Sequence, residues 1–476
     1  MKPRISAIMS CAALILAALP TQGQQEQQPA LTPTMQLMQN GTSTELQAAI
    51  EEGLDVNAVD EDGNTPLLLA AVNRRSDLMY VLLEKGANAN FVKEPGITAL
   101  GIACMFDDWS MVDLLITHGA DVNYCAPNGE STLSMACAQG AVNAVQMLVA
   151  HNAKTDVRDS KGITPLLHAV MHNTENSMAI AQMLLEKGAN VNLGMPNGFT
   201  PLMGAAQMND IELALLLLEH GADVQARQFN GGATALSIAV ALGHAEMADL
   251  LLANKADISV GINRQTSLLA YASMLARADV MEALLKHGAN ANTKDARSNA
   301  TPLHVTATGN ELIIDSVKLM GAGSLLPQHE SKMDAPYACE VLIKYGADIN
   351  ATDNDGTTPA MIAAMDGSPD TLAVLIKHGA NINAADAQGR TPLILAVLPA
   401  EAKAEISLAH VTPAAAAQVK PHVIKSMGEY PLVVDTVKAL LAAGADVSAK
   451  DKAGKTARDY ATDAEVIRLL DEAAAK

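Results

Sequence analysis

Aromatic residues are scarce in this chain. Phe, Trp and Tyr together make up 3% of its 476 residues, with a single Trp, whereas 49% of the residues are hydrophobic. Small and aliphatic side chains, Ala and Leu above all, must therefore form the core, which indicates short elements that pack closely. The high apolar content also excludes disorder of the chain as a whole.

Cations are also few. The chain has 32 Lys and Arg against 52 Asp and Glu, a formal net charge of −20. A surface this acidic repels phosphate backbones and anionic lipid headgroups, so we expect neither nucleic acid nor a membrane surface as partner. The charge could equally serve solubility alone, because no acidic run is dense enough to suggest a specific site.

Long apolar runs are absent beyond the N-terminus, so no membrane span is expected. Lys2 and Arg4 precede the apolar run Ile5–Leu19, which Pro20 and a Gln-rich stretch follow. This order is typical of a secretory signal peptide. We predict a signal peptide over residues 1–23 with cleavage near Gly23, and export to the periplasm or the medium.

A polar linker is predicted over residues 24–31. The alternative of an acylated lipoprotein would require Cys11 as the modified residue. Only residues 5–10 would then form the apolar segment, which is too short, so this alternative is disfavoured.

Cysteine is rare and carries no metal-binding spacing. The five residues are Cys11, Cys104, Cys125, Cys137 and Cys339. Cys104 and Cys137 lie 33 residues apart, at the same place in adjacent repeats of the unit described below. Stacked helices sit about 8–10 Å apart, whereas a disulfide needs Cα atoms within about 7 Å. Buried free thiols are therefore expected.

Catalytic motifs are absent as well. The chain has no G-x-S-x-G, H-E-x-x-H, P-loop or paired-carboxylate pattern. Its histidines mostly recur with the repeat: five stand just before a helix-ending Gly or its Asn substitute, where a cation favours a helix C-terminus. They are His118, His151, His220, His287 and His378. We expect no enzyme, no catalytic residue, no cofactor and no metal.

What the chain does contain is one unit repeated along its length. In residues 60–92 a turn leads into Thr65-Pro66, a short apolar helix over 67–72, a second helix over 77–85 and then Gly86. The unit opens with Thr, or once with Ser, at Thr32, Thr65, Thr98, Ser131, Thr164, Thr200, Thr234, Thr266, Thr301, Thr358, Thr391 and Thr456. Most intervals are 32 to 36 residues, which is typical of a stacked solenoid.

Each recurring residue has a physical role. Thr caps the first helix, and Pro at its first position fixes φ without losing a needed N–H. Gly after the second helix supplies a left-handed cap. Asn152 and Lys255 replace that Gly in two repeats. Asn tolerates the conformation, so we expect strain, or a differently ended helix, only at Lys255.

The T-P-L-x-x-A core and the period of 33 resemble the ankyrin repeat family, and bacterial exported members in particular. The resemblance covers residues 32–476 and implies an all-α solenoid of about twelve helix-turn-helix/β-hairpin units, with degenerate capping units at both ends. It also accounts for His304 in a T-P-L-H motif and His244 after Gly243 as structural residues.

Two intervals exceed the period because of insertions near residues 311–334 and 400–431. Both fall between the first and second helices of a repeat, on the edge opposite the hairpins. Long insertions inside a compact repeat are often functional. They could also be tolerated surface decoration, because loop length costs little entropy.

The resemblance implies a non-enzymatic scaffold, monomeric, that binds a partner protein through a concave face of hairpins and first helices. The positions that would line it precede each opening Thr or follow it by seven or eight residues, and many are apolar: Ile97, Met105, Phe106, Ile163, Met171, Phe199, Met208, Leu242, Met274 and Met365. They could instead fill gaps between repeats. Alternative roles are a periplasmic maintenance or protection factor for an enzyme, or a secreted host-directed effector.

Overall fold

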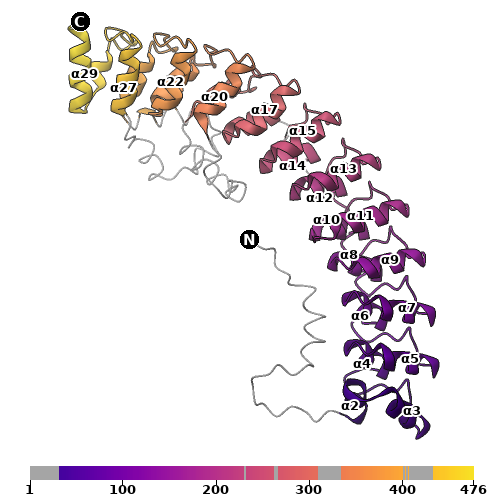
Figure 1. The fold of residues 1–476 in the computed structure, drawn as a ribbon. Coiled ribbons are helices and arrows are strands. Elements are labelled where there is room, and N and C mark those ends of the chain that lie inside the picture. The colour runs from indigo at the N-terminus through magenta and orange to yellow at the C-terminus, as the bar shows by residue number, and fades with distance from the viewer. Residues whose placement is uncertain are drawn as a thin grey trace. The chain divides into compact units, whose positions relative to one another are not determined.

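The described part of the chain consists of paired helices (Figure 1). The computed structural model describes residues 32–229, 232–261, 266–308, 334–399, 402–403, 406 and 433–476. Within them the structure has helices and no strands, and two isolated bridges join Lys93 to Ile97 and Cys125 to Ser131. The predicted all-α class is confirmed. The predicted signal peptide and linker lie outside the described residues.

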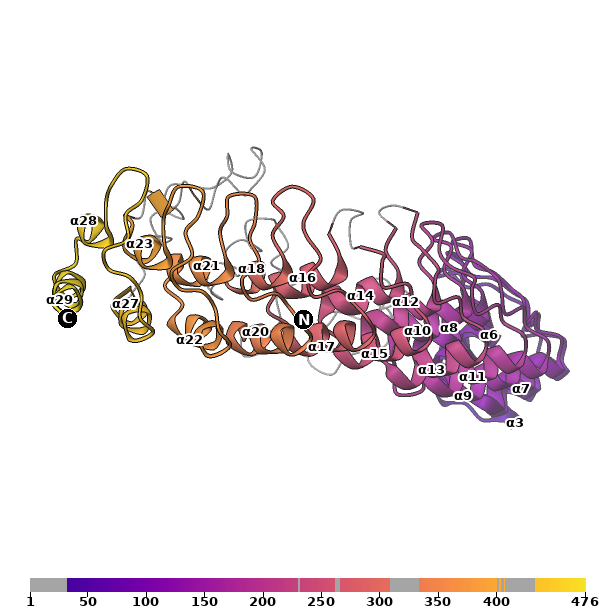
Figure 2. The same cartoon turned by 90° about the horizontal axis from the view of Figure 1, so that it is seen from above.

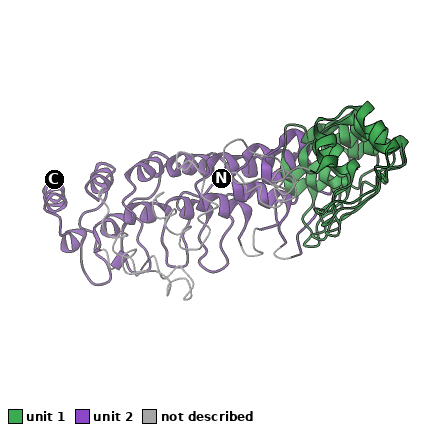
Figure 3. Ribbon diagram, turned by 90° about the horizontal axis from the view of Figure 1, so that it is seen from below, with its two compact units in different colours: residues 1–204, 215–222 green, residues 205–214, 223–476 purple. Residues whose placement is uncertain are grey.

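The chain divides into two compact units (Figure 3). Unit 1 comprises residues 1–204 and 215–222, and unit 2 comprises residues 205–214 and 223–476. The helices of unit 1 are α2 (Pro33–Asn40), α3 (Ser43–Glu51), α4 (Pro66–Val72), α5 (Ser76–Glu84), α6 (Ala99–Met105), α7 (Trp109–Thr117), α8 (Thr132–Gln139), α9 (Val142–Ala150), α10 (Pro165–His172) and α11 (Ser177–Glu186). Helices α12 (Pro201–Met208) and α13 (Ile211–Glu219) contribute residues to both units.

Unit 2 continues the same alternation. Its helices are α14 (Ala235–Leu242), α15 (Ala245–Ala253), α16 (Leu268–Met274), α17 (Ala278–Lys286), α18 (Pro302–Thr306), α20 (Ala335–Lys344), α21 (Pro359–Met365), α22 (Pro369–Lys377), α23 (Pro392–Val397), α27 (Val433–Ala442), α28 (Ala457–Tyr460) and α29 (Ala464–Ala474). Hairpin loops project from the first helices of unit 2, such as α16, α18 and α21, to one side (Figure 2). The described helices form twelve pairs, one for each predicted repeat.

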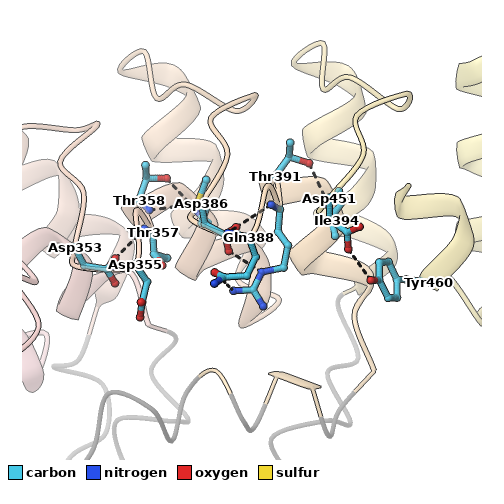
Figure 4. Close-up of polar contacts among 12 residues, drawn as sticks. Asp353, Asp355, Thr357, Thr358, Asp386, Gln388, Thr391, Ile394, Asp451 and Tyr460 are labelled. Atoms are coloured by element: carbon cyan, nitrogen blue, oxygen red, sulfur yellow. Dashed lines mark hydrogen bonds and ion pairs between the residues drawn. The ribbon is translucent and has the colours of Figure 1, made fainter. Parts of the chain in front are cut away.

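Capping explains where the first helices begin. The Thr65 hydroxyl accepts a hydrogen bond from the Leu68 N–H at 3.3 Å, and Pro66 is the first helical residue. The same bond joins the Ile394 N–H to Thr391 at 3.4 Å (Figure 4). The two helices predicted over 67–72 and 77–85 each begin one residue earlier than predicted.

One predicted repeat start is wrong. The cap of α16 is Ser267, not Thr266, since the Ser267 hydroxyl accepts from the Ala270 N–H at 3.1 Å. Leu268 and Leu269 then occupy the buried positions that Pro66 and Leu67 fill in α4. Burial of the apolar pair decides the register, and the spacing from Thr234 becomes 33 residues, the common period.

Left-handed residues end the second helices as predicted. Gly86 has φ +87°, and no atom lies within 4 Å of where its Cβ would be. Asn152 and Lys255 adopt the same conformation, with φ of 60° and 67°. Lys255 therefore keeps the common helix end at the cost of backbone strain, which is unfavourable for a residue with a Cβ.

Asparagine side chains join successive repeats beyond these glycines. The Asn90 amide donates to the Gly119 carbonyl at 2.8 Å and accepts from the Asp121 N–H at 2.7 Å. Asn292 reaches Gly346 in the same way, and Asn383 reaches Gly444, at 2.9 and 3.3 Å. Each of these last two bonds connects the repeat before an insertion to the repeat that contains the insertion.

The two insertions lie almost wholly outside the described residues. The bonds from Asn292 and Asn383 nevertheless match those between uninterrupted repeats. The helix pair that contains each insertion, α18 with α20 or α23 with α27, therefore continues the stack. These bonds are consistent with the prediction that each insertion falls between the first and second helices of one repeat.

Aspartates organise the hairpins. The Asp353 carboxylate accepts from the N–H groups of Asp355 and Thr357 at 2.9 and 2.8 Å, and Asp386 accepts from Gln388 and Arg390 in the same pattern (Figure 4). A short polar side chain that bonds its own turn stabilises it locally. The sequence analysis identified the turns but missed these aspartates, five residues before the opening Thr.

Candidate functional site

In unit 1 the predicted partner-binding residues lie at the first helices and at the hairpin ends. Ile97 and Ile163 precede Thr98 and Thr164, while Met105 ends α6 and Met171 lies in the last turn of α10. All four side chains are half-buried. They expose apolar area at the same two positions of the repeats that open at Thr98 and Thr164, with the Ser131 repeat between them, which is unusual for positions that need not pack.

A second apolar column escaped the sequence analysis. Four residues after each opening residue stand Leu69, Ile102, Met135 and His168. Leu69 and Met135 are half-buried, whereas Ile102 and His168 are buried. The sequence contained the information needed to find this column, because the four residues share one position in four consecutive repeats of unit 1.

We give one name, the apolar stripe, to the half-buried apolar residues at these three repeat positions of unit 1. They are Leu69, Met105, Met135, Met171, Ile97 and Ile163.

His168 is the polar member of this second column. Its Nε2 lies 3.3 Å from Asp159 Oδ2, and its ring stacks on His172 with centroids 5.6 Å apart. Burial lowers the pKa of His168, although the negative charges of Glu130 and Asp159 act in the opposite direction. The neutral imidazole is therefore favoured at neutral pH.

Phe199 was predicted to face a partner and does not. Its side chain is 9% exposed. Gly204, in the first helix of the same repeat, has no side chain to occupy the space, and a Cβ there would lie 3.7 Å from the ring. Phe199 therefore packs inward.

In unit 2 the predicted partner-binding residues differ in how far their side chains are exposed. Met208 is 37% exposed, and Leu242 and Met274 are half-buried. Met365 is 6% exposed, so its predicted surface position is wrong. Leu398, at the equivalent place in the next repeat, is buried as well. The unit 2 candidates therefore do not form a uniform surface.

Lys403, a described residue of the second insertion, is buried in this part of unit 2. Its ammonium donates to the Ala396 carbonyl at 2.9 Å. Burial lowers the pKa of Lys403 to about 8, with Asp366 opposing the shift. Burial of Lys403, Asp366 and Met365 together shows that this end of the first helices is covered.

Several aromatic side chains are exposed. Trp109 is 60% exposed, and Phe106 is 37% exposed. Tyr80, Phe229 and Tyr337 are exposed as well, in separate repeats. The Arg74 guanidinium carbon lies 5.2 Å from the centre of the Phe106 ring, so a cation covers that ring in part.

The histidines have the structural roles predicted for them. Nδ1 of His118 and of His220 lies 2.8 and 2.9 Å from the carbonyl four residues earlier. His304 joins Thr301 to the Thr357 carbonyl, and His244 contacts the Ala206 carbonyl. Within the described residues, no three His, Cys, Asp or Glu side chains could hold a metal ion. His329, His410 and His422 lie outside them.

Cys104, Cys137 and Cys339 are buried free thiols, as expected for the first two. Burial raises the pKa of Cys339 to about 12 and that of Cys104 and Cys137 further still. None is available as a nucleophile near neutral pH. Among the described helices, none combines the length and the apolar character required to cross a bilayer.

Known proteins similar to this chain contain the same repeats. A putative ankyrin repeat protein of fowlpox virus is 32% identical over 148 residues, 30% of this chain and 43% of the viral protein. The transient receptor potential channel pyrexia of Drosophila melanogaster is 32% identical over 139 residues, 29% of this chain and 14% of the channel. The chain thus spans less than half the length of these relatives.

Solved ankyrin repeat domains resemble the chain in part. A domain from Acinetobacter baumannii AYE is 27% identical, with a TM-score of 0.39 over 40% of this chain and 98% of that domain. The human ASB11 domain is 25% identical, with a TM-score of 0.40 over 55% of this chain and 99% of that domain.

The family model for ankyrin repeats (3 copies) matches residues 7–93, 85–159, 135–228, 177–262, 227–295 and 331–404. These matches cover well over half of the sequence and include the predicted opening residues from Thr32 to Thr391, except Thr301. The chain belongs to the ankyrin repeat family, whose repeats form protein–protein interaction modules.

Proposed function

We propose that this protein is an exported, non-enzymatic scaffold that binds another protein through the face formed by its hairpins and first helices. The observation that supports this most is the apolar stripe of unit 1, to which four consecutive repeats each contribute at least one half-buried apolar side chain. Export rests on the N-terminal order of two cations, an apolar run and a polar stretch.

An apolar segment of the partner fits the stripe best. The stripe contains three methionines, whose flexible thioethers repack around varied apolar shapes. Its one polar neighbour in the second column, His168, is buried and favoured in its neutral form, so it adds no charge. The backbone that carries the stripe is fixed by the capping bonds of Thr98 and Thr164, which limits the ordering cost of binding.

The binding test compares two surfaces of unit 1 in the full mature chain. Met105, Met171 and Ile163 are replaced together by Ser, and capture of protein from the exported fraction of the native cells is quantified by mass spectrometry. Because central apolar side chains each contribute about 1–2 kcal/mol, recovery of the specific partner should fall at least tenfold. Met178→Ser on α11, where the side chain is 36% exposed, is the matched control.

Unchanged capture by the triple variant, with native circular dichroism, would show that the stripe is not the binding surface. The identity of the captured protein then separates a general scaffold from a factor that maintains an exported enzyme. Export is tested independently: N-terminal sequencing of the mature protein should begin close to residue 24, and an intact Met1 would refute it.

A further inference from the structure

A second surface of unit 1 lies on the turn between α6 and α7. Phe106 caps the C-terminal end of α6, and Trp109 is the first residue of α7. Their side chains are 37% and 60% exposed. Arg74 of the preceding repeat lies over the Phe106 ring at 5.2 Å. We call Arg74, Phe106 and Trp109 the aromatic edge.

The backbone of this turn is held firmly although its aromatic side chains are exposed. Asp107 has a left-handed φ of 51°, and its carboxylate accepts from the Ala144 N–H at 2.9 Å and the Asn143 amide at 3.0 Å. Asp108 accepts from the Met111 N–H at 3.3 Å and lies 3.7 Å from Arg74. Contacts to both neighbouring repeats thus preorganise the turn, which lowers the cost of binding there.

The repeat itself does not require these aromatics. The equivalent turns of unit 1 contain Asn73-Arg74, Gln139-Gly140 and His172-Asn173, and none has a Phe or Trp. A large apolar side chain exposed on a rigid turn stabilises the monomer little. Trp and Arg are also the residues most enriched among those that dominate binding energy at protein interfaces.

The charge around the aromatic edge favours a cationic partner. Residues 32–204 contain 19 Asp and Glu and 8 Lys and Arg. On the turn and the start of α7, Asp107, Asp108 and Asp113 contribute three carboxylates, with Arg74 beside them. The face of an exposed indole attracts ammonium and guanidinium groups, and an acidic surface raises the rate at which cations arrive.

We propose that the aromatic edge is a separate docking surface for a basic, amphipathic segment of another protein. In this arrangement a Lys or Arg side chain of the segment lies against Trp109, and an apolar side chain lies beside Phe106. The aromatic edge shares no residue with the apolar stripe, and the proposal for one surface does not depend on the proposal for the other.

The single Trp of the chain makes the test direct, because its fluorescence reports on this turn alone. The full mature protein is titrated with a 14-residue amphipathic Lys/Leu peptide, and with a Glu/Leu peptide of the same pattern. The Lys/Leu peptide should change Trp109 emission with a micromolar dissociation constant that weakens as salt is raised. The Glu/Leu peptide should leave the emission unchanged.

Calorimetry with variants separates this site from general attraction to an acidic protein. Phe106→Ser with Trp109→Ser keeps the net charge and should weaken Lys/Leu binding at least tenfold. Tyr80→Ser, which removes an exposed aromatic from α5, should change it less than twofold. The Met105, Met171 and Ile163 triple variant should bind the peptide as the unaltered protein does.

Four outcomes would overturn the proposal: no binding of the Lys/Leu peptide, binding without a change in Trp109 emission, equal affinity of the Phe106/Trp109 variant, or loss of peptide binding in the triple variant. Because partner capture by the triple variant is measured separately, failure of the aromatic edge and failure of the apolar stripe are distinguishable. Loss of peptide binding in the triple variant would assign the peptide to the stripe and also refute the proposal.

Discussion

Gly243 is a glycine whose replacement should be costly, because a buried arginine occupies the space beside it. It follows α14 with φ +79°, and a Cβ there would lie 2.5 Å from Nη1 and 2.8 Å from Cζ of Arg277. Arg277 is 3% exposed and donates to the Ala241 carbonyl at 2.9 Å. The guanidinium thus caps the C-terminal end of α14 from the following repeat.

Gly243→Ala therefore has two costs. A left-handed conformation costs a residue with a Cβ about 1–2 kcal/mol. The Cβ also displaces the guanidinium, and losing a hydrogen bond to a charged group costs a further 1.5–3 kcal/mol or so. The expected loss in free energy of unfolding is about 2.5–5 kcal/mol. Gly288→Ala is the matched control, since Gly288 has φ +93° and no atom within 4 Å of its Cβ site. It should lose only about 1–2 kcal/mol.

The assay is urea denaturation of the full mature chain followed by circular dichroism. A double-mutant cycle isolates the clash: on an Arg277→Ala background, Gly243→Ala should lose only the cost of the backbone conformation. The reasoning fails if Gly243→Ala and Gly288→Ala are equally destabilising. It also fails if the cost of Gly243→Ala is the same with and without Arg277.

Three further predictions concern the repeat itself. Lys255→Gly relieves φ +67° and should raise the free energy of unfolding by about 1 kcal/mol, measured by urea midpoint; a loss would contradict the strain. Asn383→Ala removes two hydrogen bonds to the end of the repeat that contains the second insertion, so stability should fall by about 1–2 kcal/mol. Hydrogen exchange should then accelerate locally around residues 444–446, and unchanged protection would refute the bridging role. The Leu114 carbonyl and then Glu84 raise the pKa of His118, so its stabilisation is present below the unfolded value of about 6.5 and is lost as pH rises through the folded pKa. His118→Gln should therefore lower the melting temperature more at pH 5.5 than at pH 8.5, and an equal effect at both would contradict the shift.

The period predicted the fold well because each repeat satisfies the same local requirements. Thr65 caps the first helix, Pro66 is its first residue, and Gly86 follows the second helix. Each of these roles can be inferred from the local sequence alone. The error at Thr266 arose where two hydroxyl residues adjoin, since either can cap a helix. Burial of Leu268 and Leu269 selects Ser267, and burial depends on the neighbouring repeats.

Exposure of the candidate site was less predictable, for the same reason. Met105 and Met365 stand at one position of the repeat, yet the first is half-buried and the second is buried. Phe199 turns inward and is 9% exposed, although its position precedes an opening Thr as those of Ile97 and Ile163 do. Sequence position fixes the direction of a side chain, whereas the size of side chains in adjacent repeats decides how much of it solvent reaches.

Residues that vary from repeat to repeat are therefore of two kinds. Some have side chains bound inside the stack, and others have exposed side chains on a turn that other residues hold. Arg277 differs from His244 at the same position one repeat earlier, yet both bond a carbonyl of the preceding repeat, so a variation of this kind holds neighbouring repeats together. Trp109 departs from the unit with its side chain exposed, while the Asp107 and Asp108 carboxylates hold the turn that carries it. A departure of the second kind contributes little to folding of the free protein. In the proposal above it contributes binding energy to a basic partner segment, so the aromatic edge, rather than the buried exceptions, is where recognition is proposed.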